Sequence, residues 1–356
     1  MKIVGIFVLA FILSFIFTPL VRIICLKLGF LDLPEKRKIH TQPTPRLGGL
    51  AVIAAFFITF LLVFIIDLNF RKVFYYKVIG LGIATLLLVL AGLWDDICKM
   101  KALIKLFIQV AAALILFYSG LRIAVFTNPF VGKEMQLPFL ISLFLTVFWI
   151  VGIINAINLI DGLDGLASGF VFISGLCLLF VGLYLKTPTT IILLSILCGS
   201  SLGFLFYNFP PAKIFLGDTG SMFLGLILAV TALSGLQYKV VTSVTLLIPI
   251  CALSLPLSDI FLAIWRRYIK KTSIFIADKK HLHHRFLQLG LTQRQVVVIF
   301  YLSTIYFGII AFLFVLIPNE YALLLLILLG MGLFFGIRTV GFIERTIRKT
   351  YLLEKH

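Results

Sequence analysis

The stretch from Asn155 to Gly169, NAINLIDGLDGLASG, places polar side chains at every third residue of an otherwise apolar sequence. The series consists of Asn155, Asn158, Asp161 and Asp164. A spacing of three predicts that these side chains share one broad face of a helix, and lie closer still on a 3₁₀ turn. Their oxygen atoms, completed by phosphates and water, suit Mg²⁺. A capped helix end and a turn are the alternative, because Asn, Asp and Gly also favour turns.

Two adjacent acids, Asp95 and Asp96, end an apolar run in the segment GLWDDICKMKALIK, and Lys99, Lys101 and Lys105 follow them. Paired acids at a membrane boundary are costly and seldom without function. Neighbouring carboxylates raise one pKa while lysines lower the other, so a base and a charge-positioning partner can coexist here. A pair that caps the next helix is the alternative interpretation.

The segment YNFPPAKIFLGDTGSMFLG carries a further acid, Asp218, at the predicted start of an apolar helix. We expect its carboxylate and the free N–H groups of that helix start to face the same space. Phe215, three residues earlier, is a candidate for stacking on a base. Packing at the membrane interface is the alternative role for this aromatic ring.

Two basic loops complete the set of candidate residues. The loop LPEKRKIHTQPTPRLGG could hold phosphate by charge and forked hydrogen bonds through Lys38, His40 and Arg46. A signal for membrane topology is the alternative there. The loop ADKKHLHHRFLQLGLTQRQ, from Ala277 to Gln295, contains His281, His283, His284 and Arg285. Its basic neighbours, and the lack of a second Cys or His pair at ligand spacing, favour a phosphate or sugar-phosphate clamp over a zinc site.

The elements that position these loops follow from the composition. Hydrophobic residues make up 62% of the 356 positions and charged residues 13%, which excludes an ordinary soluble domain and predicts an all-α polytopic membrane protein. A span needs roughly 20 apolar residues. By that length we expect one domain, residues 1–356, with about eleven spans: 3–25, 48–66, 74–93, 104–118, 139–154, 167–185, 189–206, 220–237, 243–264, 296–316 and 320–338.

Charge predicts the orientation of these spans. Of the 31 Lys and Arg residues, 22 fall in one set of alternate loops and eight in the other. The positive-inside rule places the richer set in the cytoplasm, the N-terminus outside and the C-terminus inside. All the candidate loops belong to the cytoplasmic set, which predicts one site at the membrane surface. The net charge of +17 suits membrane lipid headgroups and phosphate substrates, and no module for nucleic acid is present. Pro249 and Pro256 should bend the ninth span and open a groove toward lipid.

Five motifs in a fixed order make the chain resemble the polyprenyl-phosphate N-acetylhexosamine-1-phosphate transferases, the MraY/WecA type. They are RKIHTQPTPRLGG, GLWDDI, NAINLIDGLDGLASG, FLGDTGS and HLHHRFLQLGLTQRQ. The HLHHR form resembles the branch that transfers N-acetylglucosamine 1-phosphate to undecaprenyl phosphate. The resemblance implies a multi-pass protein of the bacterial cytoplasmic membrane, a cytoplasmic active-site cleft, Mg²⁺ or alternatively Mn²⁺ as cofactor, and a homodimer.

The resemblance and the loop chemistry described above together predict roles for individual residues. Catalytic roles go to Asp95, Asp96 and Asp164, and metal binding to Asn158, Asp164 and Asp218. Nucleotide and sugar binding go to Asn155, Asp161, Phe215, His281, His283, His284 and Arg285. The lipid phosphate would meet Lys38, His40, Arg46 and Lys105. Lys99 stands where relatives in this branch often carry a third acid, which argues against a metal in that loop.

The predicted reaction joins UDP-N-acetylglucosamine and undecaprenyl phosphate to give a lipid-linked sugar pyrophosphate and UMP, by direct attack or through an aspartyl-phosphate. The same chemistry with another UDP-N-acetylhexosamine, or with UDP-N-acetylmuramoyl-pentapeptide, is the alternative within the family. A transporter of anionic lipids or nucleotides is the alternative from another class, but transporters carry functional polar groups near the bilayer midplane. A non-catalytic scaffold would leave the clustered acids unexplained.

Overall fold

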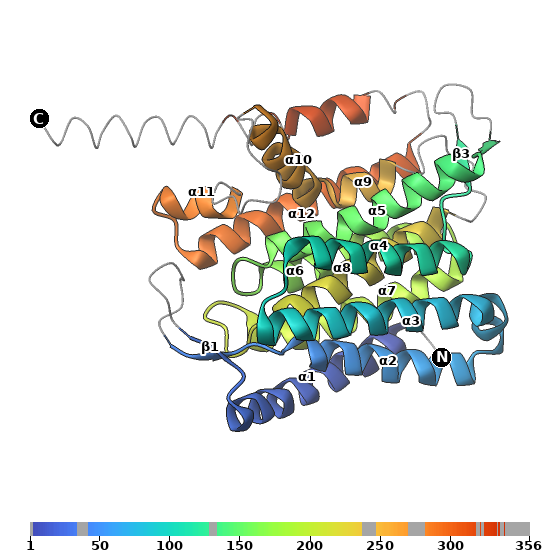
Figure 1. The fold of residues 1–356 in the computed structure, drawn as a ribbon. Coiled ribbons are helices and arrows are strands. Elements are labelled where there is room, and N and C mark those ends of the chain that lie inside the picture. Colours follow the sequence, from blue (N-terminus) through green and yellow to red (C-terminus); the bar gives the residue numbers. More distant parts are fainter. Residues whose placement is uncertain are drawn as a thin grey trace, which may run out of the picture.

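The structure is a computed structural model that describes residues 3–33, 42–127, 134–236, 247–269, 282–317, 321, 324–332, 334 and 338. The first half of the chain supplies α1 (Ile3–Leu28), α2 (Gly49–Ile66), α3 (Leu68–Cys98), α4 (Ala102–Tyr118), α5 (Phe139–Ile160) and α6 (Leu166–Tyr184). The second half supplies α7 (Pro188–Asn208), α8 (Gly217–Leu236), α9 (Leu247–Ala252), α10 (Ser254–Ile269), α11 (Leu282–Gln288) and α12 (Gln293–Leu316). The helices pack as one bundle (Figure 1).

Within the described residues, eight helices are long and apolar enough to cross a membrane: α1, α2, α3, α5, α6, α7, α8 and α12. This confirms a helical multi-pass membrane protein, but not the predicted count of eleven spans. Helix α4 has 17 residues and falls slightly short of the length used for a span. Of the predicted span 320–338, residues 321, 324–332, 334 and 338 are described, and 324–332 are helical but too short a segment to count as a span. Residues 243–246 of the ninth span lie outside the described residues.

The ninth predicted span is divided into α9 and α10 instead of forming one bent helix. The two helices meet at Leu253, whose N–H donates to the carbonyl of Pro249 at 3.0 Å. Pro256 then lies in the first turn of α10, where the N–H that proline lacks would have no partner within the helix. The second proline is therefore tolerated because a new helix begins just before it.

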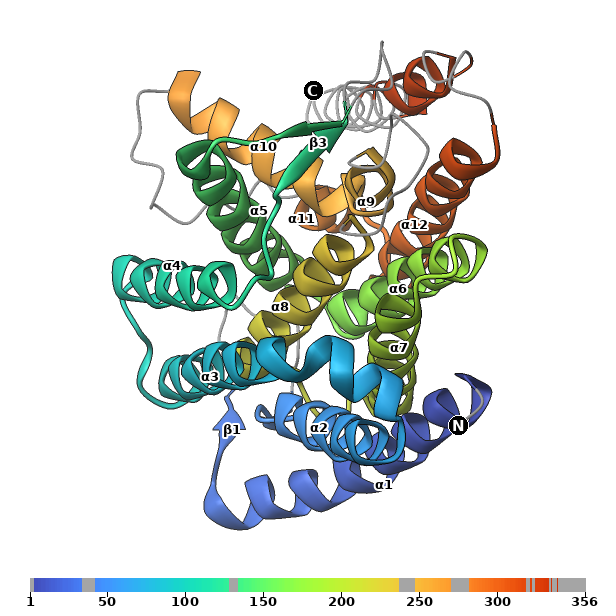
Figure 2. The same ribbon diagram turned by 90° about the vertical axis from the view of Figure 1, so that its right-hand side faces the viewer.

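Helix α8 runs through the centre of the bundle, with α2, α3, α5, α6 and α7 packed around it (Figure 2). Glycines let two of these neighbours approach the start of α8. A Cβ on Gly49 of α2 would lie 2.2 Å from the Cα of Gly220, and a Cβ on Gly92 of α3 would lie 2.4 Å from the Cα of Thr219. Because these backbones are in close contact, side chains from α2, α3 and α8 lie close together at the start of α8.

Alternating helix directions bring the chemistry-bearing segments to one end of the bundle, at the left of Figure 1. The C-terminal ends of α3, α5 and α7 lie there with the N-terminal ends of α2, α4, α6 and α8. A short antiparallel ladder joins β1 (Leu31–Asp32) to β2 (Thr44–Pro45) at this end. A second ladder, β3 (Val125–Thr127) with β4 (Glu134–Gln136), follows α4 at the other end.

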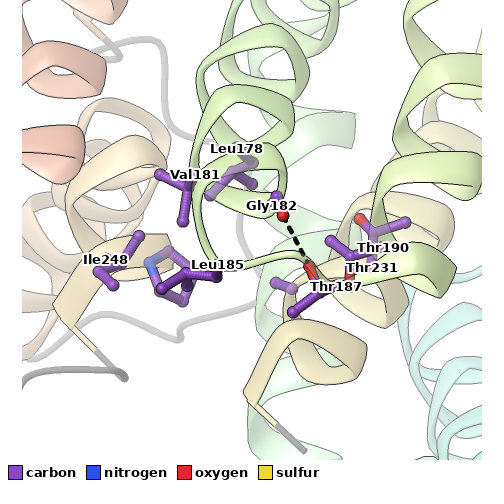
Figure 3. A pocket seen from close by; sticks show the side chains of 10 residues that line it. Leu178, Val181, Gly182, Leu185, Thr187, Thr190, Thr231 and Ile248 are labelled. Carbon is purple, nitrogen blue, oxygen red and sulfur yellow. Dashed lines mark hydrogen bonds between the residues drawn. The ribbon is translucent and has the colours of Figure 1, made fainter. Parts of the chain in front are cut away.

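A small apolar cavity of about 30 Å³ lies between α6, α7, α8 and α9, at the end away from those segments (Figure 3). The hydroxyl of Thr187 donates to the carbonyl of Gly182 at 3.3 Å beside it. Thr190, also in the wall, is 5% exposed, and its Oγ1 has no hydrogen-bond partner among the described residues. The buried hydroxyl of Thr190 thus has no hydrogen-bond partner in the part of the chain that the structure describes.

Candidate active site

The ammonium group of Lys105, in the first turn of α4, is the centre of the site. Its Nζ donates to Asp218 Oδ1 at 2.7 Å, to Asp95 Oδ2 at 2.8 Å and to Asn158 Oδ1 at 3.2 Å. A lysine ammonium has three N–H donors, so all of them are used. The contacts join α4 to the end of α3, the end of α5 and the start of α8. One cation therefore holds four helices together.

The carboxylate of Asp218 has partners on both oxygens. The amide nitrogen of Asn158 donates to Oδ1 in a short hydrogen bond and also to the hydroxyl of Ser221, at 2.8 Å. The guanidinium of Arg46 lies 3.4 Å from Oδ2. One turn before Asn158 on α5, the Asn155 side chain donates to Gln109 Oε1 at 2.6 Å. Asn155 thus lies deeper in the bundle, behind the residues that reach the cavity.

Asp96 caps the start of α8. Its Oδ1 accepts the N–H of Asp218 at 2.9 Å, and its Oδ2 accepts the N–H and the hydroxyl of Thr219 at 3.0 and 2.7 Å. Helix starts leave such N–H groups without internal partners, and a carboxylate is favoured there. The expectation that these N–H groups are free and face the substrate space was therefore wrong. Asp96 of α3 already accepts them.

Arg46 connects three carboxylates at the mouth of the site. Its Nε lies 3.0 Å from Asp96, its Nη2 3.4 Å from Asp218 and its Nη1 3.9 Å from Asp32 of β1. The ladder of β1 with β2 holds the segment that carries Arg46. Lys38 and His40, predicted to act with Arg46, lie outside the described residues. In the described part of the basic loop, the positive charge of Arg46 thus offsets part of the negative charge of the site.

The turn after α5 carries two of the predicted acids and is anchored from several sides. Asp164 Oδ2 accepts the N–H of Ala212 at 3.0 Å. Gly165 has a positive φ of 71°, which glycine adopts readily, and its N–H donates to Asn208 at 3.0 Å. The hydroxyl of Tyr301, on α12, donates to the carbonyl of Gly165 at 2.6 Å. The turn is therefore a fixed part of the cavity wall.

Asp161 ends α5 and differs from its neighbours in having no hydrogen bond to its carboxyl group within the described structure. Burial raises the pKa of the Asp161 carboxyl well above its ordinary range, and the nearby charges of Asp218 and Asp96 act in the same direction. A carboxyl group that keeps its proton can donate a hydrogen bond into the cavity. A cation bound beside it would favour the ionised form instead.

Helix α11 places the predicted histidines differently from one another. The carboxylate of Asp259 on α10 accepts the N–H of Leu282 at 3.1 Å, at the start of α11. His283 is 1% exposed, and a Cβ on Gly162 would lie only 2.5 Å from its Nε2. His284 lines the cavity. Arg285 follows on α11, and His281 lies outside the described residues. The predicted cluster thus divides into a buried docking residue and a residue that faces the cavity.

The cavity at this end has a volume of about 410 Å³. The predicted residues in its wall are Arg46, Asn158, Asp161, Asp164, Phe215, Asp218 and His284. Four further polar residues line it that we had not proposed as site residues: Asp32, Lys99, Asn208 and Gln293. No spacing or motif in the sequence marks Asp32, and Gln293 stands in the motif HLHHRFLQLGLTQRQ without a predicted role. They belong to the site only because β1 and the start of α12 fold against it.

No group of three or more His, Cys, Asp and Glu side chains converges as a metal site in the part of the chain that is described. Oxygen atoms of Asp218 and Asn158 do converge on a cation, the ammonium of Lys105. This donor set fits Mg²⁺, which is usually held by one or two carboxylates while phosphates and waters supply the remaining ligands.

The glycosyl transferase family 4 model matches residues 78–236, which include Asp95, Lys105, Asn158 and Asp218. A probable undecaprenyl-phosphate N-acetylglucosaminyl 1-phosphate transferase of Bacillus subtilis (strain 168) is 39% identical over 311 residues, covering 87% of this chain and 84% of the relative. The chain belongs to glycosyl transferase family 4. The family expected from the five motifs is thereby confirmed, and the matched segment of this family member contains the whole Lys105 cluster.

Other relatives of this glycosyl transferase family 4 protein fall into two groups. A decaprenyl-phosphate N-acetylglucosaminephosphotransferase of Mycobacterium tuberculosis (strain CDC 1551 / Oshkosh) is 36% identical over 332 residues, covering 85% of this chain and 79% of the relative. A phospho-N-acetylmuramoyl-pentapeptide-transferase of Caldicellulosiruptor bescii is 32% identical over 325 residues, covering 85% of this chain and 96% of the relative. The N-acetylglucosamine relatives are the more similar, as the HLHHR motif predicts.

Proposed function

We propose that the protein transfers N-acetylglucosamine 1-phosphate from UDP-N-acetylglucosamine to undecaprenyl phosphate and releases UMP. The observation that carries this proposal is the Lys105 cluster, in which carboxylates, an amide and a cation meet at one end of the helix bundle. Two of its members, Asn158 and Asp218, line the polar cavity. Phosphoryl transfer depends mainly on positioning and on neutralising charge, which such a cluster supplies. The names of the more similar relatives support the choice of sugar.

For the donor substrate, we assign metal binding to Asp218 and Asn158, with Asp164 nearby in the same wall. Mg²⁺, or Mn²⁺ in its place, would neutralise the pyrophosphate of the nucleotide sugar. Phe215 would stack on the uracil, and His284 would contact the pyrophosphate or the sugar, because both side chains line the cavity. Asp161 would contact the nucleotide sugar, because it lines the same cavity.

For the acceptor substrate, we assign the lipid phosphate to the positive charges of Lys105 and Arg46. Asp95 is the better candidate for the base, because both oxygens of Asp96 accept from the start of α8, whereas one oxygen of Asp95 accepts only from the flexible side chain of Lys105. Asp95 would accept the last proton of the lipid phosphate. An oxygen of that phosphate would then bond to the β-phosphorus of the nucleotide sugar, while the bond from this phosphorus to the bridging oxygen breaks and UMP leaves.

For the protein in the cell, we propose a homodimer in the bacterial cytoplasmic membrane with the cavity facing the cytoplasm. The distribution of Lys and Arg supports this orientation. The product would begin the synthesis of a cell-envelope polysaccharide, since a lipid-linked sugar pyrophosphate is a starting unit for further glycosyl transfer.

The proposal is tested by UMP release from the protein purified in detergent. We expect release from UDP-N-acetylglucosamine only when a polyprenyl phosphate and Mg²⁺ are both present. Release that needs no lipid, or that persists in excess chelator, would contradict the reaction. In a competition, UDP-N-acetylglucosamine should be consumed before UDP-N-acetylmuramoyl-pentapeptide, and the reverse preference would reject the sugar while leaving the reaction class intact.

A further inference from the structure

We propose that the ammonium group of Lys105 is an internal cation that occupies the metal-binding oxygens until the metal displaces it. The proposal rests on the assignment of Asp218 and Asn158 as metal ligands. In the structure, the oxygens of these two residues that would bind a metal are the ones that accept from Lys105 Nζ, at 2.7 and 3.2 Å. The metal and the ammonium therefore compete for the same two atoms.

Distance and charge make the two occupants mutually exclusive. Mg²⁺ binds oxygen at about 2.0–2.1 Å and demands a near-ideal octahedron of ligands. An ammonium that donates to the same oxygens would lie within a few ångströms of the metal, and two positive charges at such a distance repel strongly where water is scarce. The Lys105 side chain is only 14% exposed, so solvent screens this repulsion little. Metal binding must therefore move the ammonium away from Asp218.

The structure offers the displaced ammonium a second partner. Asp95 Oδ2 already lies 2.8 Å from Nζ, on the side of α3. The flexible four-carbon stem of lysine allows the head group to stay with Asp95 while it leaves Asp218 and Asn158. Two of its three N–H donors are then released. These donors can bind the phosphate of the lipid, so Lys105 would serve the acceptor only after the metal has reached the donor side.

The competition also predicts how Lys105 affects metal affinity. A metal that binds only after an internal group has left shows an affinity reduced by the fraction of molecules in which that group is absent. Without Lys105, Asp218 would keep Arg46 at 3.4 Å as its nearby cation and would still face the charge of Asp96. A site with fewer positive and as many negative charges should bind the metal more tightly. This is the opposite of what a lysine that only supports the metal site would show.

The test compares Mn²⁺ binding to the wild-type protein and to Lys105→Met, without substrates, by calorimetry or by the electron paramagnetic resonance of free Mn²⁺. We expect the variant to bind Mn²⁺ about tenfold or more tightly than the wild type. Without Mn²⁺, the variant should unfold at a lower temperature than the wild type. On adding Mn²⁺, its unfolding temperature should rise by more than that of the wild type. Lys101→Met is the matched control, because this exposed lysine at the start of α4 has the same charge. Its Mn²⁺ affinity should stay within about threefold of the wild type.

Equal or weaker Mn²⁺ binding in folded Lys105→Met would overturn the proposal. Lys105→Gln gives the same comparison if the methionine variant does not fold, because an amide can keep hydrogen bonds to Asp95 and Asp218 without a positive charge. Asp218→Ala separates this inference from the assignment of the metal ligands. Undiminished Mn²⁺ binding in that variant would reject the metal site itself, whereas loss of binding there, with equal affinities in wild type and Lys105→Met, would reject only the competition.

Discussion

Two adjacent residues, Asp95 and Asp96, have the same chemistry but different surroundings. Neighbours on a helix point about 100° apart, so the two carboxylates meet different partners. Asp96 is inaccessible to solvent, and its oxygens accept from the start of α8 and from Arg46. Asp95 accepts from Lys105 and from the N–H of Met100, at 2.8 and 2.7 Å. We infer that Asp96 holds the helix that carries Asp218, while Asp95, paired with the flexible Lys105, is the acid proposed as the base.

Replacing each acid by its amide should separate these roles. Asp96→Asn should lower the thermal unfolding midpoint, since a helix cap is worth about 0.5–2 kcal/mol and the amide loses its charge pairing with Arg46. Asp95→Asn should lower the midpoint less, because its amide oxygen can still accept from Lys105, and should lower UMP release about 10²-fold or more. Raising the pH should partly restore the Asp95 variant, because the lipid phosphate then ionises without a base. Equal stability of both variants would argue against the capping role of Asp96.

Asp218→Ala should lower the rate of UMP release about 10²-fold or more. The activity that remains should no longer depend on Mg²⁺. The reason is that alanine removes a charged ligand which no neighbouring described side chain replaces, and a stabiliser of developing charge is typically worth that much. Mg²⁺ titrations of activity in the wild type and the variant provide the measurement. A near-normal rate with an ordinary Mg²⁺ response would move the metal toward Asp95.

At the scale of elements, the contact between α11 and the turn after α5 determines where His284 lies. The ring of His283 packs on the backbone of Gly162, with no room for a side chain between them. Leu282 joins Leu163 and Leu166 of the turn in a small apolar cluster with Val297 of α12. Helix α11 therefore packs directly on the turn that carries Asp161 and Asp164.

Gly162→Ala should disturb this docking. The new Cβ would lie 2.5 Å from His283 Nε2, so the buried His283 ring that holds α11 against the turn must move. We expect kcat with UDP-N-acetylglucosamine to fall by about tenfold or more, because small misplacements of positioned groups are costly. Gly152→Ala is the control, since a Cβ there meets no atom within 4 Å and alanine favours the helix. A Gly162 variant as active as the control would show that the position of α11 does not limit the reaction.

At the scale of the whole molecule, the two ends of the bundle differ in polarity. The end with the site joins helices through charges and hydrogen bonds, whereas the other end encloses the apolar cavity beside Thr190. A buried hydroxyl without a partner costs stability, because it has lost water and gained nothing in exchange. Substitutions at the end with the apolar cavity should therefore change stability without changing the reaction at the proposed active site.

Thr190→Val should stabilise the protein by about 1 kcal/mol, since valine has nearly the same shape and no hydroxyl to desolvate. Thr187→Val should do the opposite, because the Thr187 hydroxyl donates to Gly182. Thermal unfolding of both variants, with UMP release as a check on the site, provides the comparison. A loss of stability in Thr190→Val would indicate that water in the cavity satisfies this hydroxyl.

Much of the architecture could be predicted from local patterns. Apolar runs predicted α1, α2, α6, α7, α8 and α12 within a few residues, and the order of five motifs indicated the family. The helices and the motif order were predictable because the period of apolar residues and the presence of turn formers act over a few neighbouring positions. The end of α5 was predicted too early: the helix runs to Ile160 and not to residue 154, so Asn155 and Asn158 lie on it.

The pairing of polar groups was decided only by the tertiary structure. Lys105 meets Asn158 across 53 positions of sequence and Asp218 across 113, while Asp96 meets Thr219 across 123. The sequence by itself determined which residues carry charge and on which helix ends they stand. It could not determine that Asp96 caps α8 or that Lys105 holds the oxygens proposed for the metal. Those partners depend on how closely α2, α3 and α5 pack against α8, and α4 against α3 and α5, and packing is a property of the whole bundle.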